Sequence, residues 1–240
     1  MTCVKPRQPD HGKLTPVSPL FVACTLDTLW MGSLIGLGLA AAVVMRPWRQ
    51  LAQPGLWTPL LAALVLLPWF WALPRLQAMP LQLQLSGAVL VLLCLGWPLA
   101  VWVMLAVSLV SDWLAPQALD AQVRELFFLG VLPASLALGL GALLRRWLPH
   151  HPFIYILGRG FLGTALCLFA ARALQTLTGA AHEEVGTGLS LVAQWLMAWG
   201  DAFLTGLMTA ILVAFRPEWL ATWSDRLYLQ PPRDASDPQP

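Results

Sequence analysis

Two charged residues, Arg159 and Asp201, lie inside long apolar segments of the sequence. A charge at bilayer depth costs several kcal/mol unless it is paired or hydrated, so both residues are candidates for a functional role. Their charges are opposite, and they can also pair with each other. A salt bridge that fixes helix register and a polar path for a solute are therefore both open explanations.

Asp27 is another acidic residue in an apolar segment, but it lies near the start of that segment, where a carboxylate can cap a helix. Paired intramembrane aspartates suggest an aspartyl protease, in which two carboxylates share one proton. Here Asp27 is peripheral, and no serine with a positioned histidine indicates a serine protease. We expect no catalytic residues and no enzymatic activity; an intramembrane enzyme is the third hypothesis.

Gly158, Gly160 and Gly163 match the G-x-G-x-x-G pattern of dinucleotide-binding loops and follow the apolar residues 153–157. Such a loop needs a soluble βαβ unit, whereas here the apolar segment continues to Leu174 as a predicted membrane helix. Close helix packing through small residues is the preferred interpretation of these glycines.

Candidate metal ligands are few and poorly arranged. His182, Glu183 and Glu184 offer suitable atoms, but neighbouring residues on a helix diverge around its axis, so a solvated polar loop is preferred. The pair at 150–151 has the same weakness and follows two arginines. The cysteines form no C-x-x-C pair. We predict no cofactor and leave the presence of a metal site open.

Composition places the chain in a lipid bilayer. Of its 240 residues 58% are hydrophobic and 11% are charged, about half the charged fraction of a soluble domain. The 14 Lys and Arg are scattered and form no basic stripe, which excludes nucleic acid as an expected partner.

The apolar segments predict an all-α membrane helix bundle. They cover residues 26–45, 56–73, 81–114, 126–144, 153–174 and 189–215. The third segment is too long for one crossing, since 34 residues of helix extend roughly 50 Å against a core of ~30 Å. We expect a break at Gly96-Trp97-Pro98 and about seven transmembrane helices, or six if this segment does not cross twice.

The expected division of the chain is a loose polar tail over 1–24, a transmembrane domain over 25–216 and a cytoplasmic tail over 217–240. With seven crossings, seven arginines share one side: Arg46, Arg49, Arg145, Arg146, Arg216, Arg226 and Arg233. Arg75 and Arg124 are then the basic loop residues of the other side. The arginine-rich side is predicted to be cytoplasmic in a multi-pass protein of the cell membrane.

Gly32, Gly36 and Ala40 recur at four-residue spacing on one face of the first predicted helix. Small residues at this spacing let another helix approach closely. The partner helix belongs either to this chain or to another subunit, and the sequence leaves both alternatives open.

Three stretches together resemble the membrane substrate-binding permeases of energy-coupling factor (ECF) ABC transporters, in the branch related to cobalt and nickel uptake. The most specific is 200–229, which is similar to the closing helix of that family and its Arg-Pro-Glu-Trp exit. The others are 85–100 and 153–165. Asp201 stands where relatives typically have Glu, Gln84 where a His is expected, and Arg159 where a neutral amide is typical.

This resemblance implies a permease without its own ATP site, which works with a membrane coupling subunit and ATPase subunits. It implies that Asp201, Arg159 and Gln84 line the substrate path and that the small-residue face of the first helix meets the partner. The implied substrate is a cobalt or nickel ion or a related small solute, although an arginine disfavours a cation site. A structural or regulatory membrane protein is the alternative.

Overall fold

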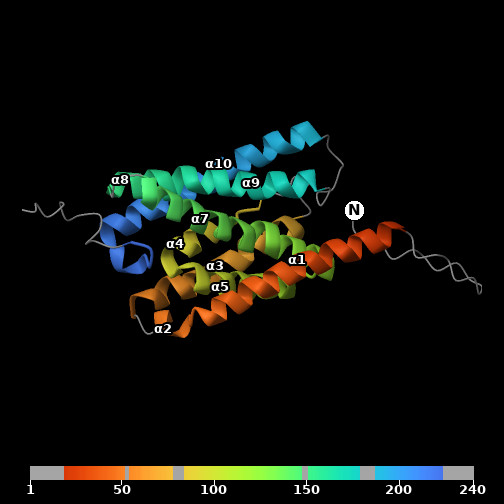
Figure 1. Ribbon diagram of the computed structural model, residues 1–240, viewed down its shortest axis with the longest axis horizontal. Helices are drawn as coiled ribbons and strands as arrows, with labels where there is room; N and C mark the ends of the chain where they lie inside the picture. Colours follow the sequence, from red (N-terminus) through yellow and green to blue (C-terminus); the bar gives the residue numbers. More distant parts are fainter. Residues whose placement is uncertain (1–18, 52–53, 78–83, 148–150, 179–186, 224–240) are drawn as a thin grey trace, which may run out of the picture.

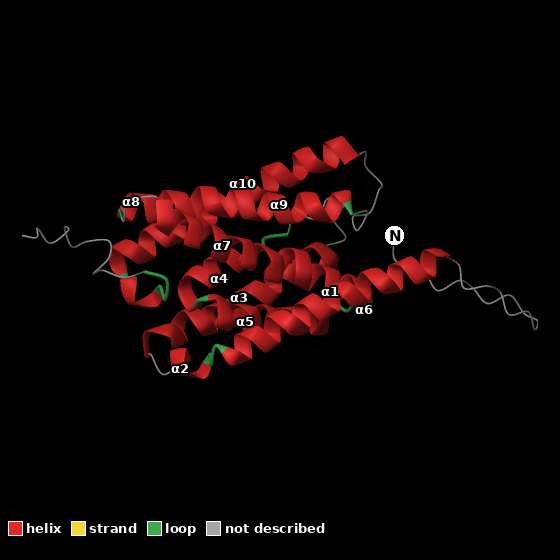
Figure 2. Ribbon diagram, in the orientation of Figure 1, coloured by secondary structure: helices red, strands yellow, loops and turns green. Residues whose placement is uncertain are grey.

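The structure is a computed structural model that describes residues 19–51, 54–77, 84–147, 151–178 and 187–223. All regular structure in these ranges is helical (Figure 2), so the expected all-α bundle is confirmed. The elements are α1 (Pro19–Val44), α2 (Trp48–Leu51), η1 (Pro54–Leu56), α3 (Trp57–Leu76), α4 (Ala88–Leu95), α5 (Trp97–Leu114), α6 (Leu119–Glu125), η2 (Leu126–Val131), α7 (Leu132–Trp147), α8 (Pro152–Ile154), η3 (Tyr155–Leu162), α9 (Gly163–Leu177), α10 (Thr187–Phe215) and η4 (Pro217–Trp219).

Six helical segments in the described ranges are long and apolar enough to cross a membrane. They are Asp27–Val44, Trp57–Leu76, Trp97–Leu114, Leu119–Trp147, Pro152–Leu177 and Gly188–Phe215. Two of them contain a π-helical stretch, η2 and η3, in which the backbone bonds are wider than in an α-helix. The protein is therefore a multi-pass membrane protein.

The long apolar segment 81–114 is broken at Gly96, as its length requires. Gly96 has a φ of 78°, which suits a residue without Cβ, and α5 follows with Pro98 in its first turn. The helix before the break is shorter than expected, because residues 84–87 are not helical and α4 has eight residues, about 12 Å of helix. Residues 81–83 lie outside the described ranges.

The chain nevertheless passes through the bundle between α3 and α5. α3 begins beside η4, since a Cβ on Gly55 would lie 3.0 Å from the Glu218 carbonyl oxygen, and it runs to the opposite end (Figure 1). By Gly96 the chain has returned, because a Cβ there would lie 3.6 Å from Nε2 of Gln50. The described ranges thus contain six long helices and, between α3 and α5, a shorter segment, residues 84–95, that ends in α4.

The ends of the bundle differ in charge. α1, α7 and α10 all end on one side (Figure 1), which brings together Arg46, the pair Arg145 and Arg146, and Arg216. Arg75 and Arg124 lie at the opposite end. The described arginines are distributed as the seven-crossing alternative predicts.

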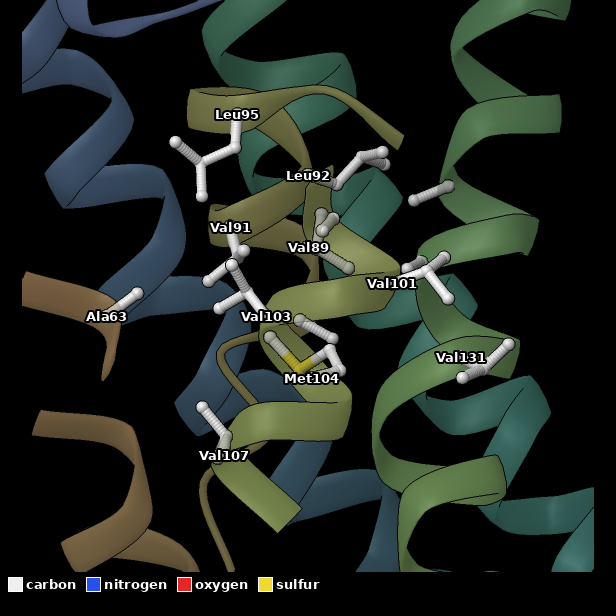
Figure 3. Close-up of a cluster of buried hydrophobic side chains, with 14 of the residues drawn as sticks. Ala63, Val89, Val91, Leu92, Leu95, Val101, Val103, Met104, Val107 and Val131 are labelled. Atoms are coloured by element: carbon white, nitrogen blue, oxygen red, sulfur yellow. The ribbon is translucent and has the colours of Figure 1, made fainter. Parts of the chain in front are cut away.

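α4 lies in the middle of the bundle, and seven of its eight residues are buried. A helix that is apolar on every side is stable only when protein or lipid surrounds it, and here α3, α5, α7 and α10 do so. Figure 3 shows the aliphatic side chains of α4 and α5 packed in this core. α1 is peripheral and exposes 67% of Leu37 and 80% of Val44, as expected for a face toward lipid.

Both ends of α4 are held by other segments. At its start, Gly87 has a φ of 64°, and a Cβ there would lie 2.5 Å from Cδ2 of Leu67. At its end, the Ala221 amide donates to the Cys94 carbonyl at 2.9 Å, and Thr222 Oγ1 donates to the Leu93 carbonyl. The described start of the predicted tail 217–240 therefore packs against the bundle. The tail 1–24 is described only from residue 19.

Candidate functional site

The non-helical residues before α4 form the centre of the candidate site. Ser86 is fully buried, and its amide donates to Oδ2 of Asp201 at 2.9 Å. Its carbonyl accepts from Nε1 of Trp71, and its hydroxyl donates to the Leu129 carbonyl at 2.6 Å. In hydrocarbon every backbone polar group needs a partner, so these bonds are what allow the helix to be interrupted here.

Asp201 is 7% exposed and lies halfway along α10. Fourteen residues separate it from each end of that helix, a distance of about 21 Å. Because α10 is long enough to span the bilayer, Asp201 and Ser86 lie near mid-depth. The carboxylate also lies at the start of α4, where the helix dipole favours negative charge.

A second polar group lies beside the break. Nε2 of Gln84 donates to the Trp71 carbonyl at 3.2 Å and makes a short contact with Oε1 of Glu125. The other carboxylate oxygen of Glu125 accepts from Nε2 of Gln117 at 2.6 Å and lies 3.4 Å from Nη1 of Arg75. This ion pair is largely buried, with 9% of the Glu125 and 16% of the Arg75 side chain exposed.

Arg172 of α9 lies within electrostatic range of both Asp201 and Glu125, and among the described residues it forms no ion pair within 4.0 Å with either. Its Nη1 donates to Oε1 of Gln175 at 3.3 Å. The break is thus surrounded by two carboxylates and two guanidinium groups from four separate elements. We refer to Arg75, Gln84, Ser86, Glu125, Arg172 and Asp201 as the α4 site.

Arg159 lies elsewhere. It is 6% exposed in η3, and its guanidinium lies across α7, where a Cβ on Gly141 would be 2.4 Å from Nη2. The guanidinium carbon is 5.5 Å from the centre of the Tyr155 ring, within cation–π range. The possible pair with Asp201 does not form. Of the three predicted path residues, the structure brings Gln84 and Asp201 together and separates Arg159 from them.

The small-residue face of α1 is open in this chain. Gly32, Gly36 and Ala40 are exposed, and a Cβ on either glycine would meet no described atom within 4 Å. Packing within the described part of the chain, one of the two alternatives, is therefore not observed.

The glycine motif and the candidate metal ligands do not form binding sites in the described part of the chain. Gly158, Gly160 and Gly163 lie in or directly after η3, a π-helix, and not in a strand-to-helix loop. Nδ1 of His151 accepts from the Phe153 amide and caps α8. The segment 182–184 lies outside the described ranges. No group of three or more His, Cys, Asp or Glu that could hold a metal ion occurs in the part of the chain searched, the described residues.

Sequence reasoning did not single out Glu125, Arg172 or Arg75 as site residues. Arg172 shares an apolar segment with Arg159, so its spacing was a usable signal. Glu125 and Arg75 adjoin the predicted ends of their segments and resembled ordinary interfacial charges.

Comparison with protein-family models, with curated proteins and with solved structures finds no match for this chain.

Proposed function

We propose that the protein is the substrate-binding permease of an ECF-type ABC transporter and that its solute binds at the α4 site. The observation that supports this most is the interrupted helix at mid-depth with buried charges around it. Interrupted helices are typical of transporter binding sites, since they leave backbone groups and a helix start available to a solute. Charges at this depth favour function because they are costly to keep.

The orientation is part of the same proposal. The end with Arg46, Arg145, Arg146 and Arg216 would face the cytoplasm, together with the carboxyl terminus. The α4 site would then be reached from the opposite side along Arg75 and Glu125, which lie nearer that end. The solute would be a cobalt or nickel ion or another small polar molecule.

Uptake of radiolabelled cobalt and nickel by cells expressing the chain with its subunits tests the site. Asp201→Asn should reduce uptake at least tenfold, whereas Asp27→Asn, which alters an exposed carboxylate bonded to Trp30, should not. If Asp201→Asn leaves uptake intact and lowers only the melting temperature, the transport role of Asp201 is wrong.

Purification in mild detergent, followed by mass spectrometry and elemental analysis, tests the partners and the metal. We expect a membrane coupling subunit and ATPase subunits to co-purify. Gly32→Leu and Gly36→Leu should release them, and Gly139→Leu is the matched control, because a Cβ on Gly139 also meets nothing within 4 Å. A lone, metal-free chain would count against this proposal.

A structural or regulatory role is the second candidate, and one observation favours it. The Asp201 carboxylate already accepts a hydrogen bond from the Ser86 amide. A residue whose role is only to hold α10 against the start of α4 would make this bond. Under this alternative, the effect of Asp201→Asn is confined to stability and assembly.

A further inference from the structure

Arg159 is a buried cation, and two of its three guanidinium nitrogens have no hydrogen-bond partner among the described residues. Within the described part of the chain its Nε and Nη1 atoms are fully buried and have no hydrogen-bond partner. The ring of Tyr155 offsets part of the charge, but a π face accepts no in-plane N–H bond. A guanidinium presents five N–H donors in a planar fork that fits an oxyanion.

No described carboxylate neutralises it. The six acidic residues in the described ranges have other partners: Trp30 for Asp27, the Gln117 amide for Asp112, Arg124 for Asp120, Arg75 for Glu125, Ser86 for Asp201 and Arg216 for Glu218. Leaving a buried charge uncompensated is strongly unfavourable. The arrangement therefore suits an anion supplied from outside the described chain.

The backbone around Arg159 is shaped to hold the side chain in place. The guanidinium fits over Gly141, where its Nη2, Cζ and Nε atoms would lie 2.4, 2.7 and 2.7 Å from a Cβ. Any other residue at 141 would displace it. η3 is π-helical, and such stretches occur often at functional sites because they redirect a side chain that an α-helix would place elsewhere.

The depth of the guanidinium favours phosphate as the oxyanion. Gly141 precedes Arg145 by four residues, or about 6 Å along α7, so Arg159 lies about one helical turn inside the arginine-rich end. That is comparable to the thickness of one headgroup layer, about 5–7 Å. Basic positions between helices at this level are typical sites for lipid phosphate groups.

We propose that Arg159 binds a phosphate group at this end of the bundle, carried either by an anionic lipid or by free phosphate. This site is separate from the α4 site and does not depend on the transport proposal. Arg159 then has the role of an anion receptor, and Gly141 and Tyr155 are its positioning residues.

Thermal unfolding of the delipidated full chain in maltoside detergent, which contains no phosphate, tests the proposal. Phosphatidylglycerol should raise the melting midpoint by about 3 °C or more over diacylglycerol, which has the same tails but no phosphate. In a parallel sample, inorganic phosphate replaces the lipid. A shift with the lipid alone assigns a headgroup ligand, and a shift with inorganic phosphate assigns a free one.

Three variants make the result specific. Arg159→Met should abolish the ligand-induced shift without lowering the midpoint of the ligand-free protein, because it removes an uncompensated charge. Gly141→Ala should reduce the shift by displacing the guanidinium, and Gly139→Ala on the open face of the same helix should keep it. The proposal is wrong if neither ligand shifts the wild type, or if Arg159→Met retains the full shift.

Discussion

Asp201 and Arg159 are both more than nine-tenths buried in helices that cross the bundle, yet their surroundings differ. Asp201 accepts a backbone N–H and interacts with Arg172, within a group in which Glu125 and Arg75 also pair. The Arg159 guanidinium faces a glycine and an aromatic ring and has two unbonded nitrogens. Burial of a charge therefore does not indicate its role; what matters is which groups compensate it.

This comparison predicts opposite effects when the charges are removed, and Asp201 should give the largest one. Asp201→Ala leaves the Ser86 amide unbonded and removes one of the two carboxylates near Arg172, so the free energy of unfolding should fall by about 3–5 kcal/mol. The melting midpoint in detergent should drop by roughly 10 °C. Asp201→Asn should cost less, because its amide oxygen still accepts from Ser86. If both variants keep the wild-type melting midpoint, the interactions of Asp201 with the Ser86 amide and Arg172 do not stabilise the protein.

Glu125 and Arg75 should show strong coupling. Either single change, Glu125→Leu or Arg75→Leu, leaves one partner charged and should destabilise the protein by about 2–3 kcal/mol. The double variant should recover much of that loss, which a double-mutant cycle of melting midpoints measures. Simple additivity of the two effects would show that the pair contributes nothing as a pair.

Gly87 tests the backbone on which the α4 site depends. Gly87→Ala requires a left-handed conformation and places a Cβ 2.5 Å from Leu67, so a loss of about 2 kcal/mol is expected. Gly139→Ala is the control, since its position is helical and open. Equal midpoints for the two variants would mean that the start of α4 can adjust freely.

Arg159 should give the smallest effect, in the opposite direction. With no ligand present, Arg159→Met should leave the free energy of unfolding unchanged or raise it by about 1 kcal/mol, because the charge lacks a described counter-ion. Chemical denaturation of delipidated protein measures this. If Arg159→Met lowers the free energy of unfolding by about 3 kcal/mol or more, as the loss of a buried ion pair does, Arg159 has a structural partner. Arg159 and Asp201 would then not differ in the way described above.

The sequence was sufficient to predict the fold, because the length and hydropathy of each apolar segment can be read without knowing what the segment packs against. The over-long segment 81–114 required a break, and Gly96 with Pro98 indicated where it occurs. The sequence was not sufficient for the site, because its bonds join residues far apart in the chain. Gln84 bonds Glu125, 41 residues away, and Asp201 bonds Ser86, 115 residues away. Pairing Arg159 with Asp201 was plausible from charge alone, but Gly141 directs the guanidinium toward α7.

The shortened α4 also escaped sequence reasoning, for a related reason. Gln84, Leu85 and Ser86 could all continue a helix, and only Gly87, with a φ of 64°, favours a break locally. They remain non-helical because Trp71, Leu129 and Asp201 bond to Ser86, and those contacts exist only in the assembled bundle.

Access of water to Ser86 is the measurement that tests the central claim, that the break before α4 is a solute site. Ser86→Cys would be introduced into a chain whose four native cysteines are replaced by Ala, and intact cells would be treated with a membrane-impermeant methanethiosulfonate. A permease must open this buried position to water in part of its cycle, so we predict that the introduced thiol is modified. A folded variant whose thiol stays unreactive would contradict the account and favour a purely structural lock between α4 and α10.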